Sequence, residues 1–437
     1  MQASHRFDPG WTCMPPENGG TTLKRVRRGL AALASLALTA ALCILGVSPA
    51  TASPASRVPS QGHCTAAAEG SAARSQGAAW TCVEADPVAD FAPVSSFAPS
   101  DPGEALKLCL EDSSKRVVSN RHAYCTRMPL KYTLLDDKNV EIGEAHIVVD
   151  AVGTLDSYSG QWTETILAVP GDMDDTVSAV DVAVNATCSG MCSTAGPAWG
   201  GAHAVVEKGG DIVQGTITYR SSVAAKTDIS HIDVTYFLDG AALGGIGVPG
   251  YDSAIFDGPT VRCDATIGKT SPIPGCIVMG HTPNVTFSRS KYRGAAVAYE
   301  WAQKNLTGRF GDADHLLSRF VDPLDPDAEK RRALTCDRSF VRGSTGVPND
   351  SCDEYPFAKS WQGGNPGAQC VDITPREVNG VWDITGVTVD RGSPPNAPCI
   401  RAHVDNADNT AAGGELGRAV QSDRILDSEW YQVIIVP

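Results

Sequence analysis

The chain has 437 residues, a formal net charge of −14 at pH 7 and 20% charged residues. That length is enough for about two or three domains, each with an ordinary hydrophobic core. The acidic balance excludes a protein that coats nucleic acid over its whole surface, because a polyanion binds positive surfaces. Any nucleic-acid site must therefore be local.

The N-terminus carries the pattern of an export signal. A basic stretch, Lys24–Arg28, precedes an apolar run from Leu30 to Val47, and the small-residue tripeptide Ala50-Thr51-Ala52 follows it. This order predicts a signal peptide over residues 1–52, and so a secreted, extracellular protein without stable membrane insertion after cleavage. The alternative is an uncleaved anchor, because the apolar run approaches the length that spans a bilayer.

The cysteines predict disulfides. Of the fourteen, Cys13 and Cys43 belong to the predicted signal, and an even number remains. An even number in an exported chain indicates disulfide bonds, and short loops favour bonds between sequence neighbours, although spacing does not settle connectivity. The preferred pairs are Cys64–Cys82, Cys109–Cys125, Cys188–Cys192, Cys263–Cys276, Cys336–Cys352 and Cys370–Cys399. Half of a zinc site is the alternative for Cys188 and Cys192, but no second Cys or His pair accompanies them.

Two regions without a chemical motif come next. Residues 53–102 are rich in Ala, Ser, Pro and Gly and predict a low-complexity linker. Residues 103–280 begin with a short helix over Glu104–Leu110 and continue with alternating, β-branched segments separated by turn residues at regular spacing. This pattern predicts a β-rich, sandwich-like domain. Its ligand is unknown, and a cell-surface ligand is one expectation.

Residues 281–437 mix helices with short strands. Apolar spacing predicts helices over Lys291–Leu306 and Ala313–Phe320, and a third that begins with Asp325 as its N-cap. A loop is expected over Asp408–Gly414, before a short helix over Glu415–Val420. Strands are expected at residues 369–373, 381–389, 399–404 and 430–436. The region is therefore predicted to be a small α+β domain.

The chemistry concentrates in the stretch Cys352–Ala358, which reads CDEYPFA and holds two adjacent carboxylates. A basic segment, Ala328–Arg332, precedes it. Further pieces follow in order: Gly363-Gly364, Asp408-Asn409 with Gly413, Arg424-Ile425-Leu426 and Val433–Val436. Together these pieces resemble the NucA/NucB deoxyribonuclease family of secreted bacterial nucleases, over about residues 281–437. The resemblance implies a compact fold related to the ββα-metal nucleases, in which an aspartate here replaces the usual histidine base.

Phosphodiester hydrolysis requires a base, a cation and groups that hold the phosphates. Asp353 is the predicted catalytic base, and burial beside Tyr355 and Phe357 would raise its pKa towards neutrality. The alternative is a residue that only caps a turn before Pro356. Glu354 falls on the opposite face of an extended strand, where it is expected to orient an arginine or to support the fold, with a direct metal role as the alternative. Two histidines, His315 and His403, are the runner-up bases.

Oxygen ligands are predicted for a divalent cation. Asn409 and Glu415 are the candidate metal ligands, and their chemistry suits Mg²⁺ or Mn²⁺. The alternatives are a turn or helix-capping role for Asn409 and a solvent-facing first-turn carboxylate for Glu415.

Phosphate contacts are expected from the basic segment. Arg331 and Arg332 are preferred over Lys330, because a guanidinium can grip two phosphate oxygens. The three cations cannot all face one way on a helix, so at least one is expected to face solvent or to pair with Asp327 or Glu329.

The sequence therefore predicts a secreted, metal-dependent, sequence-nonspecific endodeoxyribonuclease, with a β-rich N-terminal domain and a small α+β nuclease domain. The alternative from another class is a secreted β-sandwich protein that binds the cell surface or a glycan and carries an inactive nuclease-like module. A third possibility is an enzyme directed at RNA, which differs in accepting a 2′-hydroxyl.

Overall fold

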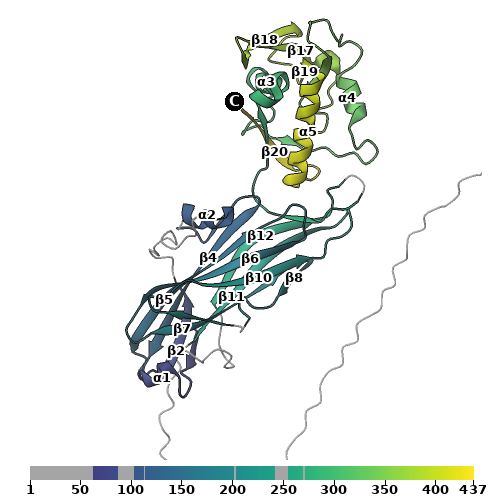
Figure 1. Ribbon diagram of the computed structural model, residues 1–437. Coiled ribbons are helices and arrows are strands. Elements are labelled where there is room, and N and C mark those ends of the chain that lie inside the picture. The colour runs from purple at the N-terminus through teal and green to yellow at the C-terminus, as the bar shows by residue number, and fades with distance from the viewer. Residues whose placement is uncertain (1–62, 87–102, 113, 201–202, 242–253, 269–270) are drawn as a thin grey trace, which may run out of the picture. The chain divides into compact units, whose positions relative to one another are not determined.

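A computed structural model describes residues 63–86, 103–112, 114–200, 203–241, 254–268 and 271–437 (Figure 1). The predicted signal peptide lies outside these residues. Across the described ranges, no helix combines the length and the apolar character that crossing a bilayer requires.

The β-rich region contains a large, mainly antiparallel sheet built on three long neighbouring strands. These are β4 (Ala123–Leu135), β5 (Glu141–Thr154) and β6 (Gln161–Met173). The sheet runs in the order β1-β2-β4-β5-β6-β10-β8, with β3 paired to β4. The remaining strands are β1 (His63–Ala66), β2 (Trp80–Ala85), β3 (Val117–Ser119), β8 (Cys192–Ala195) and β10 (Val213–Ser221), with short helices α1 (Ala72–Ser75) and α2 (Glu104–Glu111). Buried and more exposed residues alternate along β6, so one face of the sheet is covered.

A second antiparallel sheet covers that face. It runs in the order β13-β12-β11-β7-β9. Its strands are β7 (Ala179–Cys188), β9 (Ala204–Glu207), β11 (Ile229–Ala241), β12 (Ala254–Asp264) and β13 (Gly275–Val278). Side chains from both sheets, among them Ile166 and Val234, belong to one hydrophobic core. The prediction of a β-rich region is confirmed.

The linker expected over residues 53–102 is wrong for residues 63–85. β1 and β2 pair with each other, and β2 pairs along its whole length with β4. The apolar side chain of Val83 is buried in the core, so a segment that is poor in large apolar residues still contributes an ordered hairpin. Residues 87–102 lie outside the described part of the chain.

A buried carboxyl group lies inside this core. The hydroxyl groups of Tyr124, Tyr219 (2.8 Å) and Tyr236 (2.6 Å) all donate to Glu164. Trp162 stacks on Tyr219 with ring centroids 4.8 Å apart. Burial raises the pKa of Glu164 to about 7, and the three tyrosine hydrogen bonds only partly oppose this shift.

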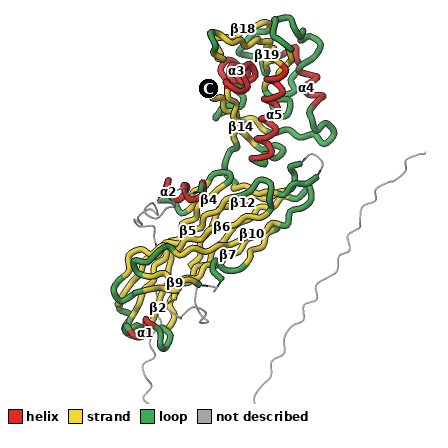
Figure 2. Tube along the Cα trace, viewed as in Figure 1, coloured by secondary structure: helices red, strands yellow, loops and turns green. Residues whose placement is uncertain are grey.

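The C-terminal region is built from two small sheets and three helices (Figure 2). One sheet has the order β14-β20-β15 and the other β16-β19-β17-β18. The strands are β14 (Asn284–Ser288), β15 (Leu317–Ser318), β16 (Asp350–Tyr355), β17 (Val371–Val378), β18 (Val381–Arg391), β19 (Ile400–Asp405) and β20 (Trp430–Val436). The helices are α3 (Arg289–Asn305), α4 (Glu329–Thr335) and α5 (Asn406–Ser422), with a 3₁₀ turn at Gly367–Gln369. α3 packs against α5 and against the sheet strands β17, β18 and β19, which forms a second core.

Three local predictions in this region are wrong. Residues 313–320 form turns and the short strand β15, because Leu317 and Ser318 pair with β20. α4 begins at Glu329, although the carboxylate of Asp325 does accept the backbone N–H groups of Glu329 and Lys330. The loop expected over Asp408–Gly414 is helical, since α5 starts at Asn406 with Asp405 as its N-cap. Packing of Ala412 into the core outweighs the poor helix propensity of the adjacent glycines.

All six preferred disulfides are present, from Cys64–Cys82 to Cys370–Cys399. The bond between Cys188 and Cys192 excludes them as ligands of a zinc ion. The Cys336–Cys352 bond joins the C-terminal end of α4 to β16.

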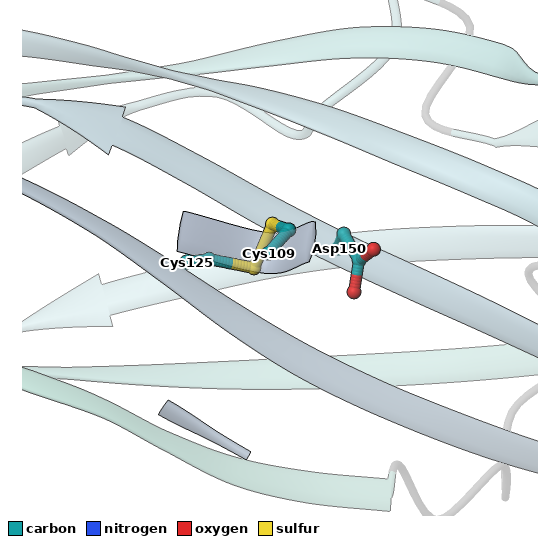
Figure 3. Close-up of side chains that lie close together, drawn as sticks. All are labelled: Cys109, Cys125 and Asp150. Carbon is teal, nitrogen blue, oxygen red and sulfur yellow. A yellow bond between two sulfur atoms is a disulfide. The ribbon is translucent and has the colours of Figure 1, made fainter. Parts of the chain in front are cut away.

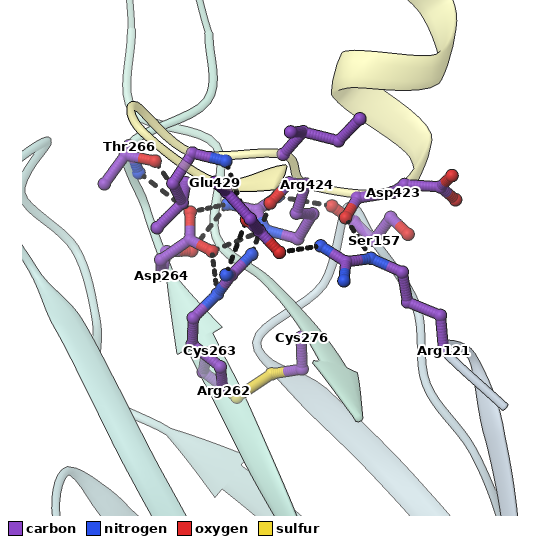
Figure 4. Close-up of polar contacts among 12 residues, drawn as sticks. Arg121, Ser157, Arg262, Cys263, Asp264, Thr266, Cys276, Asp423, Arg424 and Glu429 are labelled. Atoms are coloured by element: carbon purple, nitrogen blue, oxygen red, sulfur yellow. Dashed lines mark hydrogen bonds and ion pairs between the residues drawn. A yellow bond between two sulfur atoms is a disulfide. The ribbon is translucent and has the colours of Figure 1, made fainter. Parts of the chain in front are cut away.

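A buried ion-pair network connects β12 with the segment between α5 and β20 (Figure 4). Arg424 and Asp264 are both fully buried, and Arg424 Nη2 lies 2.5 Å from Asp264 Oδ1. Glu429 accepts hydrogen bonds from Arg121 at 2.6 Å and from Arg262 at 2.8 Å. The polar groups are therefore paired across a large separation in sequence, and β20 is anchored at its start by residues of the β-rich region.

Candidate functional site

The two adjacent carboxyl groups lie on β16. This strand pairs antiparallel with β19, where Asp353 is opposite Ala402 and Glu354 is opposite Arg401. Successive side chains of a strand point to opposite faces, so the two carboxyl groups leave the strand on different sides. Both are buried, with 4% of Asp353 and 8% of Glu354 exposed.

Asp353 faces α3 and an aromatic cluster. Its Oδ2 accepts a hydrogen bond from Tyr299 at 2.9 Å, and the ring of Tyr299 contacts those of Tyr355 and Phe357. Burial raises the pKa of Asp353 well above its ordinary value, and the charge of Glu354 adds to this shift, whereas the Tyr299 hydrogen bond opposes it. The aspartate therefore has the raised basicity that a general base needs.

Glu354 faces α4. Its Oε1 lies 3.6 Å from Nε of Arg332 and accepts the backbone N–H of Ala358 at 3.4 Å. Burial raises the pKa of Glu354 to about 7, although Arg332 and the Ala358 N–H both favour the charged form. The charge of Glu354 also raises the pKa of Asp353, so the titrations of the two carboxyl groups are coupled.

The cations of the basic segment have different roles, and that of Arg331 is structural. Arg331 Nε donates to the carbonyl of Ala358 at 2.8 Å and Nη2 to that of Ser360 at 2.7 Å, with a further bond to Gly363. Its guanidinium also lies 4.2 Å from the centre of the Phe320 ring. Arg331 is thus committed to holding the loop after β16, and the prediction that it grips a phosphate is not supported.

The second glycine of the motif pair is explained by the same contact. Gly364 has a φ of +72°, and an added Cβ there would lie 2.8 Å from the Arg331 side chain. Only glycine adopts this conformation easily and leaves room for the arginine. Gly364 therefore allows the loop after β16 to pack against the side chain of Arg331.

Arg332 and Lys330 remain available for a phosphate. Arg332 pairs with Glu329 at 2.6 Å, as one of the three cations was expected to do, and 40% of its side chain is exposed beside Glu354. No contact of the Lys330 ammonium group is present among the described residues, and this side chain is exposed. The guanidinium nearest the carboxyl pair is that of Arg332.

The two candidate metal ligands lie at different places. Asn409 is adjacent to β16, because its Nδ2 donates to Ser351 Oγ and to the carbonyl of Cys352, both at 3.1 Å. Glu415 instead accepts hydrogen bonds from Tyr292 and Arg418 and lies 3.5 Å from Lys291 Nζ. Burial raises its pKa, but Tyr292 and Arg418 outweigh burial and lower it.

The prediction of Glu415 as a ligand beside Asn409 is therefore not supported. In the continuous helix α5 it lies six residues beyond Asn409, about 9 Å along the axis. Across the described part of the chain, no contact links Glu415 to Asp353.

An oxygen donor beside β16 fits a hard divalent cation. The Oδ1 of Asn409 accepts no hydrogen bond from the described residues. Mg²⁺ commonly binds one or two protein oxygens and completes its coordination with water and substrate phosphate. The residues present are compatible with that arrangement.

A second group of potential ligands, Cys109, Cys125 and Asp150, does not form a metal site (Figure 3). The two sulfur atoms are bonded to each other, so neither is a thiolate. The carboxylate of Asp150 is held by Arg127 through two hydrogen bonds of 3.0 and 3.1 Å. This cluster is structural.

The alternative histidine bases bond to groups other than the carboxyl pair. His403 is buried, with Nδ1 2.7 Å from Asp350 Oδ2 and its ring stacked on Phe340. His315 is exposed and bound to Asp312 at 2.9 Å. Neither contacts Asp353 or Glu354 in the described structure.

Sequence reasoning missed Tyr299, which fixes one oxygen of Asp353. Tyr299 lies on α3 and is buried in the second core. The sequence predicted the helix over Lys291–Leu306 but gave no signal for this contact.

Comparison with known proteins bears on this same region. Residues 313–381, which include α4, β16 and β17, match the family model described as deoxyribonuclease NucA/NucB. No curated protein and no solved structure matches the chain.

Proposed function

Because its C-terminal region carries a NucA/NucB deoxyribonuclease domain, we propose that this protein is a secreted, metal-dependent endodeoxyribonuclease without sequence preference. The domain indicates a nuclease with DNA as its substrate, and its family suggests a divalent metal. The observation that carries the proposal is the Asp353–Glu354 pair: two buried carboxyl groups with raised pKa values and an arginine alongside.

Asp353 acts as the general base. Tyr299 holds its Oδ2, which orients the carboxylate while it takes a proton from the attacking water. The charge of Glu354 raises the pKa of Asp353 and so makes it a stronger base. Glu354 also positions Arg332, whose guanidinium stabilises negative charge on the phosphate oxygens.

Asn409 supplies an oxygen ligand for Mg²⁺ or Mn²⁺, and water and substrate phosphate would complete the coordination. Such a cation, when bound, neutralises charge that develops at the phosphorus centre. The antiparallel pair β16–β19 followed directly by α5 supports a ββα-metal arrangement for this site. A β-rich domain from β1 at residue 63 to about residue 280, and a nuclease domain over about residues 281–437, also belong to this proposal.

Contacts to phosphates and not to bases account for the lack of sequence preference. Secretion is supported by the N-terminal signal pattern and by the six disulfides, which persist in oxidising compartments. Asp353 is strongly buried and Arg331 and Glu415 are engaged elsewhere, so an inactive nuclease-like module on a surface-binding sandwich remains the competing function.

Digestion of plasmid DNA and of RNA by purified, oxidised residues 53–437 separates these functions. The proposal predicts that the protein nicks DNA at many sites, leaves RNA largely intact, and loses this activity in Asp353→Ala. Sequencing of the cut ends tests the lack of preference. A folded protein that cuts neither substrate would support the alternative of a surface-binding protein. Preferential cutting of RNA would show that RNA, and not DNA, is the substrate.

A further inference from the structure

A surface pocket lies beside the Cys336–Cys352 disulfide. Its volume is about 380 Å³, and it is lined by Cys336, Asp337, Arg338, Phe340, Arg342 and Cys352. The disulfide joins α4 to β16, so the pocket wall is covalently fixed to the strand that carries the carboxyl pair.

Two arginines give this pocket an unbalanced positive charge. Arg338 and Arg342 are exposed, and neither guanidinium forms a hydrogen bond or ion pair within the described residues. The one carboxylate in the lining, Asp337, is already bound by Ser339 at 2.5 Å and by Arg401 at 3.0 Å. These contacts lower its pKa. In a chain with a net charge of −14, two free guanidinium groups in one concavity indicate a site for an anion.

The pocket is close to the carboxyl pair. Cys352, which lines it, directly precedes Asp353 in the chain, and Sγ of Cys336 lies 3.8 Å from Oε2 of Glu354. Cys352 and Glu354 point to the same face of β16, towards α4. The disulfide therefore lines the pocket and also contacts Glu354.

We propose that Arg338 and Arg342 bind a backbone phosphate of the DNA strand next to the phosphate that is cleaved. This inference rests on the proposed function. Guanidinium groups match phosphate oxygens in geometry and charge. The pocket thereby aligns the strand along the Arg332 and Glu354 side of β16.

Binding of duplex DNA to the oxidised protein in the presence of chelator tests this role without cleavage. Fluorescence anisotropy at several salt concentrations gives the affinity and its salt dependence. Each of Arg338→Ala and Arg342→Ala is expected to weaken binding and to lower the slope of log K against log salt by less than about one, because the other guanidinium still contacts the phosphate. The double variant removes the phosphate contact and should lower the slope by about one. The matched control is Arg220→Ala, which removes an exposed arginine on β10 with no side-chain partner among the described residues.

Kinetics and a conservative variant separate binding from misfolding. In cleavage assays, Arg338→Ala/Arg342→Ala should raise KM for plasmid DNA and leave kcat nearly unchanged. The variant Arg338→Lys/Arg342→Lys keeps both charges and should recover most of the salt dependence. Salt slopes and KM values equal to those of Arg220→Ala overturn the pocket proposal.

The two proposals fail in different ways. If the wild-type protein cuts no DNA but the arginine variants still weaken DNA binding, the pocket is a phosphate site and the nuclease proposal is wrong. If the wild-type protein cuts DNA and the arginine variants behave like Arg220→Ala, the nuclease proposal stands and the pocket proposal is wrong.

Discussion

Two buried glutamates, one in each half of the molecule, share a pKa of about 7 but differ in what surrounds them. Glu164 in the β-rich region is enclosed by the hydroxyl groups of Tyr124, Tyr219 and Tyr236. Glu354 in the C-terminal region has a 3.4 Å backbone contact and an arginine at 3.6 Å, with a second carboxyl group next in the chain. Burial raises the pKa in both cases, but only Glu354 lies beside groups to which the proposed function assigns a catalytic role. A raised pKa alone does not identify an active site.

The largest expected difference concerns catalysis. Asp353→Asn preserves the shape of the side chain but removes the base, so kcat for plasmid cleavage should fall by about 10²–10⁴-fold. Glu164→Gln, the equivalent change in the sandwich, should leave kcat within about twofold, because Glu164 touches no catalytic group. Similar losses in both variants would mean that burial and folding, not the chemistry of β16, control the rate. Circular dichroism of both variants checks their folding.

The next largest effect is the contribution of Glu164 to the pH dependence of the unfolding free energy. Its folded pKa of about 7 is above the ordinary glutamate value of 4.5. The folded protein therefore retains a proton that the unfolded chain has released. The resulting stability is fully present below about pH 4.5 and is lost as the pH rises through about 7, by roughly 3 kcal/mol. Urea unfolding at pH 5 and pH 8 should show a smaller decline in Glu164→Gln, which resembles the protonated form. An unchanged decline would contradict this assignment.

Glu354→Gln should shift the pH at which the cleavage rate rises, and it should change the maximal rate less. The base must be unprotonated, and burial raises the pKa of Asp353 well above its ordinary value, so the wild-type rate should rise with pH as Asp353 loses its proton. Removing the charge of Glu354 lowers the pKa of Asp353, and the rising limb should move to lower pH. The same measurement on Glu164→Gln serves as the control. A limb that stays in place would show that Glu354 does not tune Asp353.

The smallest expected effect is a difference in unfolding free energy between two arginine variants. Arg331 is hydrogen-bonded, whereas Arg220 has no side-chain partner among the described residues. Arg331 donates to three backbone carbonyls, and lysine cannot reproduce this fork, so Arg331→Lys should cost about 1–2 kcal/mol of unfolding free energy. Arg220→Lys, on an exposed face, should change stability by less than about 0.5 kcal/mol. Equal urea midpoints for the two variants would argue against a structural role for Arg331.

The sequence was most informative where local spacing determines structure. Alternation predicted the β-rich region but missed strands such as β9 and β12. Neighbour preference identified all six disulfides of the described residues, because short loops are entropically favoured. The strand expected over residues 430–436 is present as β20. The motif around Asp353 was found because its residue types are specific, and the family match confirmed the resemblance.

Tertiary contacts decided the remaining elements. The glycine-containing stretch Asp408–Gly414 became helical because Ala412 and Leu416 pack into the second core. Residues 63–66 form a strand because they pair with the edge of β2 that β4 does not occupy. Arg331 and Glu415 found partners on segments distant in sequence, the loop after β16 and α3 respectively. Such pairings depend on the assembled fold and leave no trace in residue spacing.

The metal dependence of plasmid cleavage tests the central claim most directly. Supercoiled plasmid is incubated with the oxidised wild-type protein at pH 8 in Mg²⁺, then with excess chelator, and then with Mg²⁺ restored. A carboxyl pair on β16 that works with a bound cation predicts relaxation and fragmentation in Mg²⁺, arrest in chelator and recovery afterwards. A folded protein that leaves the plasmid intact in both Mg²⁺ and Mn²⁺, or that cuts equally well in chelator, would contradict the account.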